Sequence, residues 1–110
     1  MKNIITEIVN NMRYIISESQ HNKLQMRQWV LRRQELFMSE YNDSLTQTNP
    51  CNHDNSERYI NRVIHYTMDG LHPHFYLIDN FDYELLFEVI LNMVYVDLSE
   101  KYYSEIENCR

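Results

Sequence analysis

Glycine and proline are scarce in this sequence: its 110 residues include one Gly and two Pro. The single glycine, Gly70, cannot build a glycine-rich phosphate loop, a Rossmann fingerprint or a nucleophile elbow. β-Sandwiches and β-barrels need Gly, Pro or Asn-Gly at turn after turn. The composition therefore argues against these folds and against most phosphate-handling chemistry, and it favours long helices.

Long apolar runs and cysteines are also scarce. No run reaches the roughly 18 apolar residues that a membrane span requires. The first 17 residues, MKNIITEIVNNMRYIIS, break their isoleucines with polar residues, unlike a signal peptide. Without such a signal, the two cysteines, Cys51 and Cys109, predict free thiols in a reducing compartment, the cytoplasm. One disulfide between the tail and the middle loop is the alternative.

Basic residues are few, and they are unevenly placed. Residues 1–39 hold six Lys and Arg against three acids, whereas residues 40–110 hold four against thirteen. Such asymmetry indicates either internal pairing of the two halves or two distinct contact faces. The isoelectric point of about 5.2 argues against direct nucleic-acid binding.

Apolar residues recur at helical spacing in four segments, which predicts an all-α single domain spanning residues 1–110. A polar loop is expected at 42–55, and residues 74–78 are either a buried connector or a short extended segment. Ser17, or Ser19 in its place, is the expected cap of the second helix. Gly70 is the expected left-handed end of the third, and Asp79 or Asn80 the expected cap of the last. The four expected helices cover residues 3–16, 18–41, 56–71 and about 81–108, the last with a break near 95–97.

Five residues could ligate zinc in principle: Cys51, His53, His65, His72 and His74. Their one-residue spacings are tighter than those of structural zinc sites, so no metal or cofactor is expected. Cys51 lies in a polar loop without a basic cluster to activate it. We therefore predict no catalytic residue and no enzymatic activity. An enzyme would need His65, His72 and Cys51 to converge on one pocket.

Two groups of residues are candidate contacts for a protein partner. Basic side chains surround the only tryptophan in the second predicted helix, and acidic side chains gather at the start of the last one. The alternative for the arginines is internal pairing with those acids. The predicted partner-binding residues are Trp29, Arg32, Arg33, Asp82, Glu84 and Glu88.

Three short segments carry a family resemblance. They are MRYIISESQHNKL, RVIHYTMDGLHPHF and FDYELLFEVI. They resemble small uncharacterised proteins encoded by tailed phages, especially marine ones. The resemblance covers about half of the chain. It implies a virus-encoded accessory protein and carries no activity over to any residue.

The sequence favours a non-enzymatic interaction or regulatory protein that acts on a host or viral protein. One alternative is an acidic inhibitor that imitates nucleic acid, which requires acids clustered on one exposed face. A second is a virion structural or assembly subunit, which predicts a homo-oligomer formed through Trp29 and the tyrosines. No membrane partner is expected.

Overall fold

A computed structural model describes residues 18–109, and this part of the chain is helical without a strand. The predicted helix at 3–16 and the predicted cap at Ser17 lie outside the described residues. No helix between residues 18 and 109 is long and apolar enough to cross a bilayer. The prediction of a small all-α bundle is confirmed. Its α-helices are α2 (Glu18–Arg32), α3 (Gln34–Gln47), α4 (Ser56–Leu71) and α5 (Tyr83–Glu105), with 3-10 turns η1 (Pro50–Asn52), η2 (His72–His74) and η3 (Ile106–Cys109).

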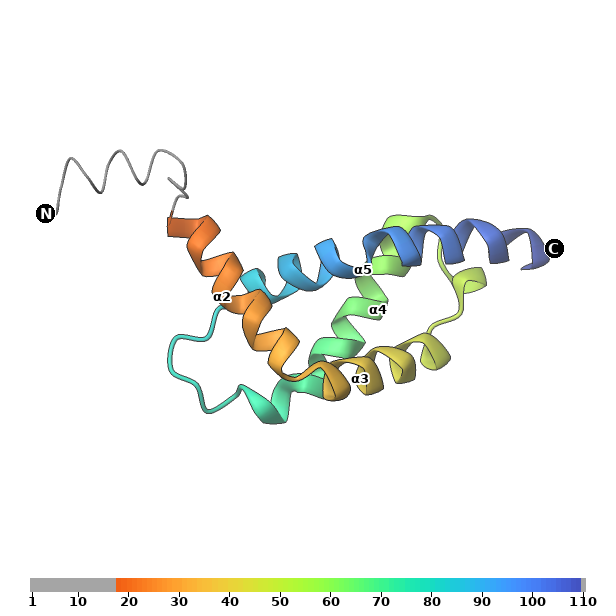
Figure 1. Ribbon diagram of the computed structural model, residues 1–110. Coiled ribbons are helices and arrows are strands. Elements are labelled where there is room, and N and C mark those ends of the chain that lie inside the picture. Colours follow the sequence, from red (N-terminus) through yellow and green to blue (C-terminus); the bar gives the residue numbers. More distant parts are fainter. Residues whose placement is uncertain (1–17, 110) are drawn as a thin grey trace, which may run out of the picture.

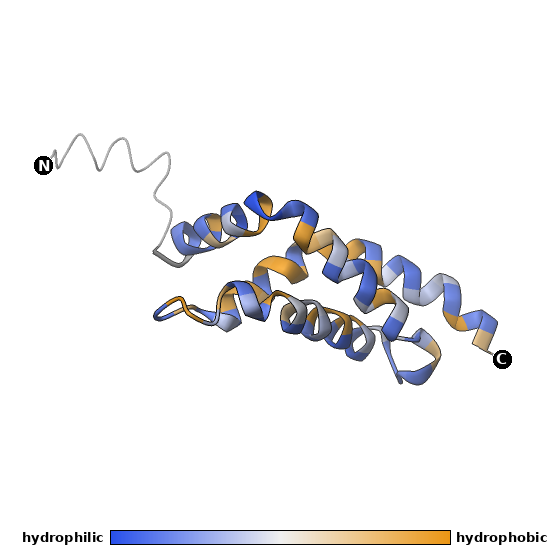
Figure 2. Cartoon of the chain, turned by 90° about the horizontal axis from the view of Figure 1, so that it is seen from below, coloured by the Kyte–Doolittle hydropathy of each residue, from blue (hydrophilic) through white to orange (hydrophobic). Residues whose placement is uncertain are grey.

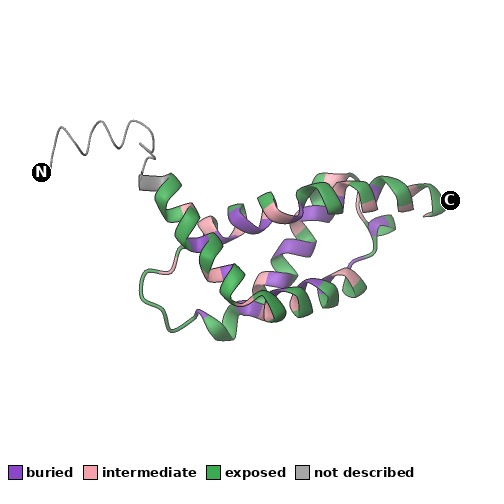
Figure 3. Cartoon of the chain, in the orientation of Figure 1, coloured by how far each residue is buried: buried purple, intermediate pink, exposed green. Residues whose placement is uncertain are grey.

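Helix α4 is the centre of the bundle. It packs against α3 on one side and against α5 on the other, while α2 crosses the first half of α5 (Figure 1). Buried residues run along α4 and along the inward sides of its neighbours (Figure 3). The predicted apolar stripe of α4 is the part that is buried, at the three- and four-residue spacing of one helical face. Its buried residues are Tyr59, Ile60, Val63, Ile64, Thr67 and Leu71.

The prediction of one helix over residues 18–41 is wrong, because the chain breaks at Arg33. The backbone angles there are φ −116° and ψ 36°. The Arg33 N–H donates to the Val30 carbonyl at 2.9 Å, and the Arg33 carbonyl accepts from Phe37 N–H at 2.8 Å. No Gly or Pro marks this break. It lets α2 pack on α5 while α3 packs on α4.

The predicted loop 42–55 also begins too early, because α3 continues to Gln47. Polar side chains of this segment form hydrogen bonds inside the bundle. Thr67 donates to the Ser44 hydroxyl at 2.9 Å, and Thr48 donates to the Ser44 carbonyl at 2.7 Å. Hydrogen-bonded hydroxyls of this kind are tolerated in a core. The polar composition therefore indicates the connection between α3 and α4 correctly only for residues 48–55.

Gly70 does not end α4 in a left-handed conformation, as the sequence suggested. It lies within the helix, and the described part of the chain has no glycine with positive φ. A Cβ at this position would overlap the carboxylate of Glu40 on α3. The missing side chain therefore leaves room for Glu40 beside α4.

Residues 74–78 form turns, so the extended segment that the sequence allowed does not occur. Phe75 is buried, whereas the three residues after it are exposed. Helix α5 begins later than predicted: Asp82 is its N-cap and accepts a hydrogen bond from Leu85 N–H at 3.0 Å. Neither Asp79 nor Asn80 caps it, and Asn80 takes a positive φ of 58° in the preceding turn. The predicted break near 95–97 is absent, since α5 runs through it.

Candidate functional site

A groove of about 690 Å³ opens between α4, η2 and the first half of α5. Apolar and aromatic side chains contribute much of its lining, and carboxylates and imidazoles contribute the rest. Grooves that combine apolar walls with a few polar groups are the usual form of binding sites. The lining residues are His65, Met68, Asp69, His72, Phe75, Tyr83, Glu84, Phe87 and Glu88.

Packed aromatic rings support one end of the groove. Phe75 is 1% exposed and stacks on Phe81, with ring centroids 4.4 Å apart. Trp29 meets Phe81 edge-on at 5.5 Å, and Tyr83 meets Phe75 edge-on at 5.2 Å. Edge-to-face and offset-stacked pairs each add about 0.5–1.5 kcal/mol beyond burial. The rings therefore fix this wall of the groove.

Within the described part of the chain, three carboxylates line the groove and no Lys or Arg does. Asp69 comes from α4, and Glu84 and Glu88 come from successive turns of α5. Glu88 forms a long ion pair of 3.7 Å with Lys23, in which both side chains are largely exposed. An exposed pair of this kind contributes little stability. The groove thus combines negative charge with aromatic surface, which favours cationic groups that also carry apolar atoms.

The imidazoles of the groove are held by local contacts. The Nδ1 of His65 lies 2.8 Å from the Asn61 carbonyl, and its ring is 5.2 Å from that of Phe87. His72 stacks on Tyr76 with centroids 5.5 Å apart. An enzyme was expected to need His65, His72 and Cys51 in one pocket, and His65 and His72 do share the groove. The third, Cys51, lies elsewhere, and no metal-binding group of three His, Cys, Asp or Glu forms within residues 18–109.

Trp29 and Arg33 contact each other within the molecule. The guanidinium carbon of Arg33 lies 4.2 Å from the centroid of the Trp29 ring, and Arg33 donates to the Trp29 carbonyl at 3.0 Å. Trp29 is half-buried and packs on the core, while Arg32 is exposed. The structure therefore places Trp29 and Arg33 at the break between α2 and α3.

The acidic candidates separate into two groups. Glu84 and Glu88 line the groove, whereas Asp82 caps α5 and shares a different, shallower hollow with Trp29. Within the described residues, no arginine pairs with an acid of α5, and the cation that does so from α2 is Lys23. Asp69, Phe75 and Phe87 are groove residues that were not predicted from the sequence, although Asp69 lies four residues after His65, on the same face of the predicted helix.

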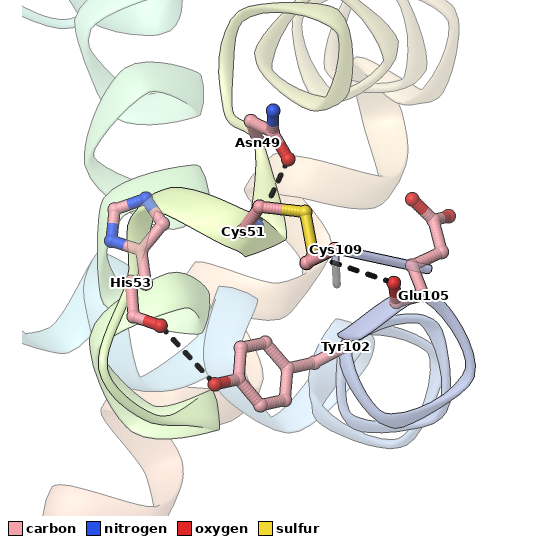
Figure 4. The surroundings of a disulfide bond; sticks show 6 residues. All are labelled: Asn49, Cys51, His53, Tyr102, Glu105 and Cys109. Atoms are coloured by element: carbon pink, nitrogen blue, oxygen red, sulfur yellow. Dashed lines mark hydrogen bonds between the residues drawn. A yellow bond between two sulfur atoms is a disulfide. The ribbon is translucent and has the colours of Figure 1, made fainter. Parts of the chain in front are cut away.

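The expectation of two free thiols is wrong, because Cys51 and Cys109 form a disulfide (Figure 4). Their Cα atoms lie 5.5 Å apart, inside the range that the bond allows. The Cys51 N–H donates to Asn49 Oδ1 at 2.9 Å, and Tyr102 donates to the His53 carbonyl at 3.2 Å. The inference of a reducing compartment rested on free thiols and loses that support.

No family model, curated protein or solved structure matches the chain.

Proposed function

We propose that the chain is a non-enzymatic protein-interaction domain whose groove binds a segment of a protein partner. The segment carries Lys or Arg beside a large apolar side chain. The observation that carries this proposal is the meeting of three carboxylates, from Asp69, Glu84 and Glu88, with the aromatic surface of Phe75, Tyr83 and Phe87. A cation over such rings gains from both charge and ring attraction.

An exposed apolar turn beside the groove supports a macromolecular partner. Tyr76, Leu77 and Ile78 are 54%, 78% and 44% exposed. Tyr76 stacks on His72, which lines the groove, so the turn continues its apolar surface. In Figure 2 this turn projects from the bundle and includes hydrophobic residues. Contiguous exposed apolar surface with a polar rim is typical of protein contact sites.

The partner in this proposal is a host or viral protein, and the chain is a virus-encoded accessory factor, as the motif resemblance implies. Local contacts favour a groove over a nucleic-acid mimic. Several acids outside the groove are already engaged: Asp82 caps α5, Glu105 pairs with Lys101 at 2.6 Å, and Asp54 pairs with Arg58 at 3.3 Å. A mimic needs its acids free to face a basic surface.

The test is selection of a random peptide library on the immobilised full-length chain. The groove variant is Asp69→Lys/Glu84→Lys. The matched control, Asp43→Lys/Glu100→Lys, makes the same change in net charge at exposed acids that do not line the groove. Circular dichroism and thermal unfolding first establish that both variants fold.

We expect selected peptides to be rich in Lys or Arg next to Trp, Phe or Leu. Their affinity should fall at least about tenfold in the groove variant, or about 1.4 kcal/mol, and change by less than about twofold in the control. Equal losses in both variants would mean that net charge alone attracts the peptides. Peptides without cations, or no selected peptides at all, would contradict the proposal.

A further inference from the structure

A cationic hollow lies directly beside the groove on the same helix. It measures about 470 Å³, and it meets the groove at His65, which lines both. Its cationic side chains are Arg58 and Arg62, in a chain of net charge −6. The lining residues of the hollow are His53, Arg58, Asn61, Arg62 and His65.

The hollow presents an arginine beside an aromatic ring, which is the combination that the groove is proposed to bind. The guanidinium carbon of Arg62 lies 5.7 Å from the ring centroid of Tyr66, and both side chains are exposed. A cation therefore stands beside an aromatic ring on the outer side of α4. Arg58 is less available, because it pairs with Asp54 at 3.3 Å.

Arg62 lies too far along α4 from Asp69 to reach the centre of the groove in its own molecule. Arg62 and Asp69 are seven residues apart, which is about two helical turns or roughly 10 Å along one face. His65 lies between them, three residues after Arg62 and four before Asp69. Rotating a second copy by a half-turn about an axis beside His65 brings Arg62 of each copy opposite Asp69 of the other. Both pairs form at once, as a twofold interface requires.

We infer that the partner of this groove is a second copy of the chain, docked with the two α4 helices antiparallel. This inference rests on the proposed function, since it uses the same groove. Arg62 and Asp69, on either side of His65, face their opposites only when the two helices are antiparallel. In a parallel pair, Arg62 would face Arg62 and Asp69 would face Asp69. The available strip from Arg58 to His72 is about 21 Å long. Stable interfaces bury roughly 1,200–2,000 Å² in total, so a contact confined to one strip of this length should give a weak dimer.

Analytical ultracentrifugation of the full-length chain tests the inference over a range of protein and salt concentrations. The variants are Arg62→Glu, Asp69→Arg and the swap Arg62→Glu/Asp69→Arg. The control is Arg27→Glu/Glu100→Arg, which makes the same exchange at exposed residues that line neither the groove nor the cationic hollow. Circular dichroism confirms the fold of each.

The wild type and the control should form a dimer that dissociates as salt rises. Each single reversal should weaken the dimer at least about tenfold, and the swap should restore it, because opposite charges again face each other in trans. A wild type that stays monomeric, or a dimer that neither single reversal weakens, would overturn the inference.

The two proposals fail separately. A monomeric chain whose groove still selects cationic peptides would reject self-association and leave the proposed function standing. A monomeric chain that selects no peptide would reject both.

Discussion

Cys51 in η1 and Cys109 at the end of η3 are joined across 58 residues of sequence. The bond closes a loop that contains both helices of the groove, α4 and α5. A crosslink of this length restricts the unfolded chain far more than the folded one. The disulfide therefore stabilises the bundle mainly by lowering the entropy of the unfolded state.

Replacing both cysteines, as Cys51→Ser/Cys109→Ser, should lower the free energy of unfolding by about 2–4 kcal/mol. Urea denaturation followed by circular dichroism measures the loss. A thiol reductant should destabilise the wild type by a similar amount and leave the double variant unchanged. A wild type insensitive to the reductant, with its two thiols shown to be free, would contradict the pairing.

Two tyrosines near the disulfide should respond differently to loss of their hydroxyl groups. The Tyr59 hydroxyl is buried and has no hydrogen-bond partner among residues 18–109, whereas Tyr102 donates to the His53 carbonyl. Tyr59→Phe removes a buried hydroxyl that makes no hydrogen bond to offset its loss of hydration. The free energy of unfolding should therefore stay equal or rise by up to about 1 kcal/mol. Tyr102→Phe should lower it by about 0.5–1.5 kcal/mol. The same urea experiment compares them, and the reverse order would contradict these positions.

Alkaline pH should destabilise the fold through its buried tyrosines. Burial raises the pKa of Tyr41 and of Tyr59 from 10.0 to about 12, with the negative charges of Asp97 and Glu105 adding to the respective shifts. The folded state therefore holds these protons more tightly than the unfolded state. The associated stability is intact below pH 10 and declines as pH rises from 10 to about 12.

Tyrosinate absorbance during a rapid pH titration measures these two groups, with Tyr41→Phe and Tyr59→Phe assigning the late steps. Each variant should lose one high-pH step and unfold at higher pH than the wild type. Titration of all nine tyrosines near pH 10 without unfolding would contradict the burial.

The start of α5 provides a test of one capping contact. Asp82→Ala removes the side chain that accepts from Leu85 N–H and should lower the free energy of unfolding by about 1 kcal/mol. Asp79→Ala is the matched control, since Asp79 is exposed and does not cap the helix, and its effect should stay within about 0.5 kcal/mol. Equal losses of stability in the two variants would contradict the capping role of Asp82.

The helices were predictable because their signals are local. The stripe from Tyr59 to Leu71 shows the periodicity of one buried face, and the same periodicity identified α5. The break at Arg33 was not predictable, because tertiary packing sets it and no Gly or Pro marks it. The role of Gly70 was equally hidden, since it depends on Glu40 from another helix.

The disulfide could have been inferred from topology once the helices were placed. The connection over residues 72–82 turns the chain back, so the residues before α4 and after α5 reach the same end of the bundle. Cys51 and Cys109 occupy those two positions. The groove was harder to predict. Glu84 and Glu88 were predicted contact residues on one helix, but Asp69 joins them only through the packing of α4 on α5.

The most direct test of the central claim is an NMR titration of the isotope-labelled full-length chain with a selected cationic peptide. The account predicts that the largest shift changes fall on groove residues, with Phe87, Asp69 and Glu84 foremost, and that they disappear in Asp69→Lys/Glu84→Lys. Shift changes confined to α3, or unaltered binding by the groove variant, would contradict it.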